Sequence, residues 1–137
     1  MTLEEKIKEL LGREKHVELA YLFGSAARGE AGKLSDIDVA VYLDESLTPG
    51  ERFDLRLELI GKLTFLLGTD NVDLVVMNDV PILLKYNIIK EGTLLRAEKG
   101  LKAKVESDIL SKYLDMKYYI DRHAREGLKR VAKEGIL

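Results

Sequence analysis

The sequence contains no cysteine, no apolar run long enough to cross a bilayer, and no large excess of either charge. Without cysteine the chain cannot form disulfides or thiolate metal sites, and this composition fits a reducing cytoplasm. A membrane helix needs about 20 mainly apolar residues, so we expect no membrane segment. The formal net charge of −2 argues against a broad basic surface, and we expect no binding of nucleic acid.

The N-terminal residues lack the charged and then apolar pattern of a signal peptide. No repeat, linker or low-complexity segment interrupts the 137 residues, a length that suits one hydrophobic core. We therefore expect a single domain over residues 1–137.

Hydrophobic periodicity predicts an α/β (α+β) protein. Residues 48–68 form the best-marked helix, because Thr48 and Glu51 have capping-box spacing and Gly68 ends the segment. The expected helices cover residues 2–15, 48–68, 79–90 and about 100–133, and the expected strands cover 17–23, 36–43, 71–77 and 93–97.

The helix over residues 48–68 carries an apolar face that we expect to enter the core. Its other side contains charged residues that we assign to the solvent. The apolar face comprises Phe53, Leu57, Ile60 and Leu67 with Leu59 and Leu63, and the charged side comprises Arg52, Arg56 and Glu58.

A tight turn follows the first strand at Gly24 and Ser25. Such a turn directs backbone N–H groups outward and can hold phosphate, and Arg28 could add a fixed positive charge. The alternative is an ordinary connection between a strand and a helix, with Arg28 only a surface charge. The Gly-Ser pair alone does not decide between these interpretations.

Two acids open the second strand. Asp36 and Asp38 project to the same side of that strand, and Ile37 and Val39 project to the other. Two neighbouring carboxylates repel each other unless a cation lies between them, and their oxygen ligands suit Mg²⁺ or Mn²⁺. The alternative is a solvated strand edge with two surface acids.

A third acid, Asp73, lies inside the apolar third strand. Burying a carboxylate there is unfavourable unless it is paired or ligated, so we assign Asp73 to the same site. The nearby acids Asp70 and Asp79 occupy turn positions, where local hydrogen bonding explains them.

The long C-terminal helix carries Tyr113, Tyr118 and Tyr119. These tyrosines belong either to the core or to a surface that binds another chain, and both interpretations stay open. The second interpretation makes the helix a possible homo- or hetero-oligomer interface.

The residues together predict a nucleotidyl-transfer site, since this chemistry depends on positioning and charge neutralisation. Gly24 and Ser25, ten residues, and then Asp36-Ile37-Asp38 resemble the signature of the DNA polymerase β-like nucleotidyltransferase superfamily. The short chain resembles its minimal nucleotidyltransferase branch.

The resemblance implies a small mixed β-sheet flanked by helices, with a catalytic core over about residues 17–97. It implies ATP as substrate and release of pyrophosphate. The residues themselves predict two Mg²⁺ ions at Asp36, Asp38 and Asp73. They also predict triphosphate contacts at Gly24 and Ser25, with Arg28 either a further contact or a surface charge. The resemblance also implies an antitoxin that transfers AMP to a tyrosine of a HEPN-domain RNase toxin. Nucleotidylation of a small molecule, as in aminoglycoside-modifying relatives, and an antitoxin that acts by binding alone remain alternatives.

Overall fold

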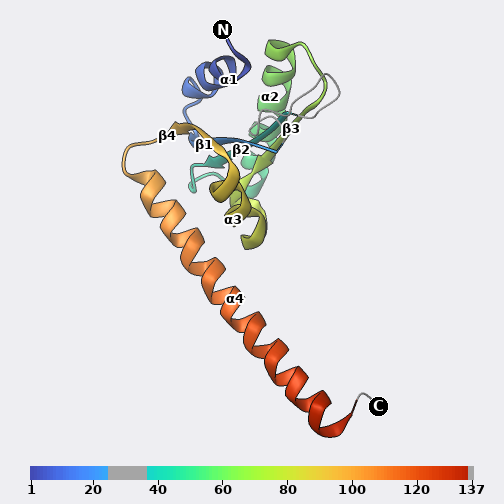
Figure 1. Cartoon of the computed structure of the whole chain (residues 1–137). Coiled ribbons are helices and arrows are strands. Elements are labelled where there is room, and N and C mark those ends of the chain that lie inside the picture. The colour runs from blue at the N-terminus through green and yellow to red at the C-terminus, as the bar shows by residue number, and fades with distance from the viewer. Residues whose placement is uncertain (25–36, 136–137) are drawn as a thin grey trace.

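The structure is a computed structural model that describes residues 1–24 and 37–135. In those ranges a mixed sheet is surrounded by helices, and the last helix extends away from the body (Figure 1). The elements are α1 (Leu3–Gly12), β1 (Val17–Phe23), β2 (Ile37–Leu43), α2 (Pro49–Leu67), β3 (Val72–Val76), the 3₁₀ turn η1 (Met77–Asp79), α3 (Ile82–Glu91), β4 (Thr93–Ala97) and α4 (Leu101–Glu134).

The described strands form one sheet in the order β3-β2-β1-β4. β1 pairs antiparallel with both β2 and β4, whereas β2 and β3 are parallel. Parallel neighbours need a crossover, and α2 supplies it between β2 and β3. The mixed sheet flanked by helices is therefore confirmed.

Helices cover both faces of the sheet. On one face α1 and α2 pack against Val39 and Val41, and on the other α3 and the start of α4 pack against Ala40. Alternation along β2 therefore places Asp38 on the α3/α4 face, because Asp38 has the parity of Ala40.

Local signals set several helix ends as expected. The Thr48 side chain accepts from the N–H of Glu51, the Glu51 carboxylate accepts from the N–H of Thr48, and Gly68 closes α2 with a left-handed backbone. The prediction that a helix starts at Asp79 was wrong. Pro81 is extended and α3 begins only at Ile82, because η1 takes the preceding residues.

The expected buried face of α2 was partly wrong. Leu59 and Leu63 are fully buried, but Phe53 is 57% exposed and Leu57 is 51% exposed. Ile60 and Leu67 pack against the core only in part. The buried face is therefore rotated toward Leu59 and Leu63, and the start of α2 presents an aromatic ring to solvent.

Helix α4 has 34 residues, which corresponds to a length of roughly 51 Å. Only Val105 and Ile109 of this helix are buried, and its C-terminal part extends beyond the body (Figure 1). Glu106 accepts a hydrogen bond of 2.5 Å from the Tyr21 hydroxyl, which joins the start of α4 to the middle of the sheet.

The tyrosines of α4 differ in their exposure. Tyr113 stacks on Tyr86 of α3 with ring centroids 3.7 Å apart, so it contributes to packing. Tyr118 and Tyr119 are exposed. Within residues 1–24 and 37–135, no helix combines the length and the apolar character that a membrane span requires.

Candidate active site

Gly24 directly follows β1 and has a left-handed backbone conformation that other residues rarely adopt. Its φ is +74°, and a Cβ atom built on it would lie 2.3 Å from Oδ2 of Asp38. That distance is far inside van der Waals contact, so only glycine fits while Asp38 keeps this position. Gly24 is thus packed directly against the carboxylate of Asp38.

Asp38 and Asp73 face each other across the parallel pair β2/β3. They are register partners, and adjacent strands lie about 4.8 Å apart, so the two side chains leave the same face as neighbours. Phe23, the residue before Gly24, is the register partner of Asp38 on the other side. Three sequence-predicted residues, Gly24, Asp38 and Asp73, therefore lie together at one end of three adjacent strands.

The expectation that Asp73 is buried was wrong. Its side chain is 57% exposed, because β3 is an edge strand and this position opens to solvent. Burial therefore does not explain an acid in this apolar strand. The exposure does leave the carboxylate accessible to a ligand.

Ser25, Arg28 and Asp36 lie outside the described residues. Among the residues that the structure does describe, no group of three acidic or histidine side chains is close enough to hold a metal ion. The proposed third ligand, Asp36, is one of those outside.

The donor chemistry of the described pair fits a hard divalent cation. Carboxylate oxygens from two adjacent strands, one of them well exposed, are the type of ligand that Mg²⁺ takes, with water in the remaining positions. Asp38 and Asp73 fit such an ion.

The first turns of α2 attach to β3 and η1 through two arginines. The guanidinium of Arg52 donates to Asp79 at 2.8–3.1 Å and to the carbonyl of Leu47 at 2.9 Å. Nε of Arg56 donates to the carbonyl of Leu74 at 2.9 Å, and its Nη2 lies 3.9 Å from Oδ1 of Asp73. The prediction that these arginines only face solvent, and that Asp79 only makes a local turn, was wrong.

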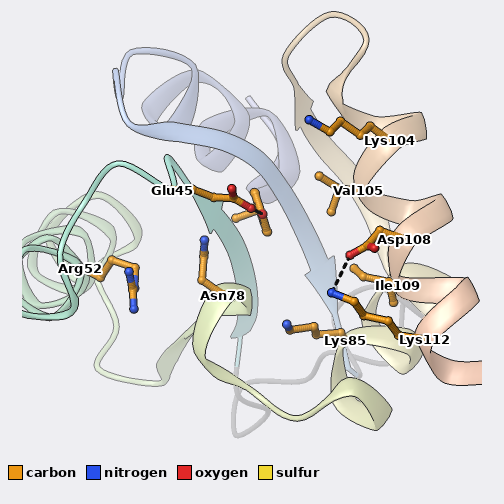
Figure 2. A pocket seen from close by; sticks show the side chains of 10 residues that line it. Glu45, Arg52, Asn78, Lys85, Lys104, Val105, Asp108, Ile109 and Lys112 are labelled. Atoms are coloured by element: carbon orange, nitrogen blue, oxygen red, sulfur yellow. Dashed lines mark hydrogen bonds and ion pairs between the residues drawn. The ribbon is translucent and has the colours of Figure 1, made fainter. Parts of the chain in front are cut away.

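A basic cleft occupies another part of the α3/α4 face (Figure 2). Its volume is about 480 Å³. Tyr42 lies in it, four residues after Asp38 on β2, which is roughly 13 Å along the strand. The lining residues are Tyr42, Glu45, Arg52, Asn78, Lys85, Lys104, Val105, Asp108, Ile109 and Lys112.

Charges in this cleft are partly neutralised. Lys112 pairs with Asp108 at 3.0 Å, and the Tyr42 hydroxyl donates to Glu45. Burial and the neighbouring Glu45 carboxylate raise the pKa of Tyr42 above its ordinary value, so the phenol stays protonated. Neither Asp38 nor Asp73 lines the cleft, which therefore stands apart from the acid pair.

Comparison with known proteins identifies relatives of this chain. The family model described as "Polymerase beta, Nucleotidyltransferase" matches residues 5–99, from α1 through β4. Protein adenylyltransferase MntA of Aphanizomenon flos-aquae is 28% identical over 109 residues, covering 72% of this chain and 69% of that protein. "Putative protein adenylyltransferase MJ1379" of Methanocaldococcus jannaschii is 42% identical over 86 residues, covering 58% of this chain and 82% of that protein.

Solved structures share the fold over nearly the whole chain. A chain in a crystal structure of a toxin–antitoxin with AMP-PNP superposes with a TM-score of 0.72 and 27% identity, covering 91% of this chain and 98% of that one. A chain of the MntA–HepT toxin–antitoxin superposes with a TM-score of 0.66 and 26% identity, covering 92% of this chain and 97% of that one. The similarity therefore extends beyond residues 5–99 into α4.

Proposed function

Because the chain belongs to the polymerase beta nucleotidyltransferase family, we propose that it transfers AMP from ATP to a tyrosine of a HEPN-domain RNase toxin and acts as its antitoxin. The observation that carries the proposal is the junction of Gly24, Asp38 and Asp73 at one end of the sheet. The relatives named as protein adenylyltransferases, and the related toxin–antitoxin with AMP-PNP, support the choice of nucleotide and acceptor.

In the proposed mechanism the chain contributes position and charge rather than covalent chemistry. Asp38 and Asp73, with Asp36, would hold Mg²⁺. When bound, Mg²⁺ neutralises developing negative charge on the phosphates and makes the acceptor hydroxyl more acidic. The turn at Gly24 and Ser25, with Arg28, would hold the β- and γ-phosphates of ATP.

The proposed reaction is an in-line displacement. The acceptor oxygen bonds to the α-phosphorus of ATP, and the bond from that phosphorus to the oxygen bridging to the β-phosphate breaks. Pyrophosphate leaves with the electron pair, and the hydroxyl proton passes to the exposed carboxylate of Asp73. The products are pyrophosphate and a partner that carries AMP through a phosphodiester.

A cytoplasmic setting completes the proposal, because ATP is the nucleotide donor. The whole of residues 1–137 acts as one domain in this account, with the core at about residues 17–97.

The test is whether the RNase stays inactive after the chain has been removed from it. Purified toxin is incubated with ATP, Mg²⁺ and either the unaltered chain or Asp36→Ala/Asp38→Ala, and residual RNA cleavage is measured after the chain is removed. We expect only the unaltered chain to leave the toxin inactive. Lasting inactivation by the double variant would favour an antitoxin that acts by contact and would contradict the enzymatic proposal.

A further inference from the structure

A groove of about 420 Å³ follows the free edge of β3 beside Asp73. Within residues 1–24 and 37–135, β3 pairs only with β2, so no described strand lies along its other edge. The first turns of α2 form the opposite wall of the groove. The lining residues are Pro49, Arg52, Phe53, Arg56, Asp73, Leu74, Val75, Val76, Asp79 and Val80.

The exposed strand edge is partly covered. The carbonyl of Asn71 accepts from the N–H of Ile37 on β2, so the backbone groups of Leu74, three residues on, point away from β2. Arg56 donates to the outward carbonyl of Leu74 at 2.9 Å. This bond blocks continuous pairing with an added strand, so an occupant of the groove must bind mainly through its side chains.

Both arginines of the groove are held in place. Arg52 is 16% exposed and is fixed by Asp79 and the carbonyl of Leu47, and Arg56 is fixed by the carbonyl of Leu74. The groove therefore has a preformed shape on the α2 side. Its two arginines and its two acids, Asp73 and Asp79, leave it without net charge.

Phe53 supplies an exposed aromatic surface within this wall. It is 57% exposed and precedes the buried residues of α2, which begin at Leu59. It shares a helix face with Arg56 at a spacing of three residues. Aromatic rings gain from edge-to-face or offset contact with other rings. The groove thus has an aromatic surface and, in the same lining, a solvent-accessible carboxylate.

We propose that this groove binds the acceptor tyrosine, with its ring against Phe53 and its hydroxyl directed at Asp73. The inference rests on the proposed function and adds the surface that holds the acceptor side chain. A phenol carries its hydroxyl at the far end of a rigid ring, which suits a groove that offers both an aromatic surface and a carboxylate. Serine and threonine have no ring to pack on Phe53.

The chain offers a matched control for this surface. Phe65 is the other exposed phenylalanine of α2, at 91% exposure, and it does not line the groove. Phe53→Ala should raise the KM for the acceptor protein at least about tenfold, while Phe65→Ala leaves it within about twofold. ATP binding should be unchanged in both variants, and Phe53→Trp should restore the KM.

Binding without ATP separates this inference from the proposed function. The probe is a peptide that spans the acceptor tyrosine of the partner encoded by the adjacent gene, compared with the same peptide carrying serine. We expect the tyrosine peptide to bind at least about tenfold more tightly, and Phe53→Ala to abolish the difference.

The outcomes are distinguishable. AMP transfer that is unaffected by Phe53→Ala would overturn the groove while leaving the proposed function in place. Selective tyrosine-peptide binding without any transfer would retain the groove and overturn the proposed function. Equal binding of both peptides would overturn the groove whether or not transfer occurs.

Discussion

Gly24 couples the backbone of the turn to the position of Asp38. Gly24→Ala should lower the rate of AMP transfer by about 100-fold, because the added Cβ would displace the Asp38 carboxylate. That Cβ would lie only 2.3 Å from Oδ2 of Asp38. Gly68→Ala is the matched control, since Gly68 also has a positive φ of +65° but its Cβ would meet open space.

The two glycine variants are compared by urea unfolding and by initial transfer rates. Each should lose about 1–2 kcal/mol of unfolding free energy from the left-handed backbone, and only Gly24→Ala should lose transfer. An equal loss of rate in both variants would mean that lowered stability, and not the carboxylate position, limits the reaction.

Asp73 can be tested without disturbing the fold, because its side chain is exposed. Asp73→Asn should change the unfolding free energy by less than about 0.5 kcal/mol. It should slow AMP transfer by about 10²–10⁴-fold, the usual contribution of a positioned proton acceptor. Asp70→Asn, three residues earlier and exposed, should change neither quantity, and a normal rate in Asp73→Asn would remove Asp73 from the site.

At the level of single residues, strand alternation was enough to predict the face on which Asp38 lies. It could not predict the exposure of Asp73, because whether β3 is an edge or a central strand depends on the order of the whole sheet. Strand alternation also could not predict the hydrogen bond of Arg56, because its partner is a backbone carbonyl on a strand 18 residues away. Phe53 was expected in the core because it is apolar and falls on the apolar face of its helix, but it is exposed.

Among the elements, α2 carries a pH-sensitive cap. The hydrogen bond from the N–H of Thr48 lowers the pKa of the Glu51 carboxylate below its ordinary value of 4.5. A lowered pKa in the folded state makes this stabilisation present above pH 4.5 and lost as the pH falls through the folded-state pKa. Melting curves between about pH 6 and pH 3 should show a smaller loss of Tm in Glu51→Gln than in the unaltered chain.

Helix α4 is fastened to the sheet by Tyr21. Tyr21→Phe removes the hydrogen bond to Glu106 and should lower the unfolding free energy by about 1–2 kcal/mol. The loss should stay in this range because Glu106 keeps its ion pair with Lys102 at 2.9 Å. Tyr118→Phe, an exposed position on the same helix, should have no effect in the same urea titration. An unchanged stability in Tyr21→Phe would show that apolar and aromatic packing, and not this hydrogen bond, holds α4 to the body.

Most elements were predictable because their ends carry local signals. Strands 17–23 and 93–97 match β1 and β4, and the capping box at Thr48 and the glycine at 68 set α2. The start of α3 was missed because the 3₁₀ turn η1 directly follows β3, so the α-helix begins later in the chain. The rotation of the buried face of α2 was missed because the sheet, and not the helix, selects which apolar residues it covers.

At the scale of the molecule, the distal part of α4 contributes little to the fold. Residues 117–135 are exposed apart from the half-buried Gly127. A chain that ends after Met116 should therefore keep its unfolding free energy within about 1 kcal/mol of the full chain. We expect the same truncation to weaken association with the partner protein, measured by light scattering on a size-exclusion column.

Global unfolding of the truncated chain would show that the distal helix is required for the fold. Unaltered association would place the partner interface on the body and not on α4, and would contradict the oligomer interface expected from the sequence.

Intact-mass spectrometry of the partner protein shows directly whether AMP has been transferred to it. The chain, ATP, Mg²⁺ and the protein encoded by the adjacent gene are mixed, and the partner is weighed and then mapped by peptide. We expect a mass gain of one or more AMP units on a tyrosine, and no gain with Asp36→Ala/Asp38→Ala. A partner of unchanged mass, although inactivated by the unaltered chain, would contradict it.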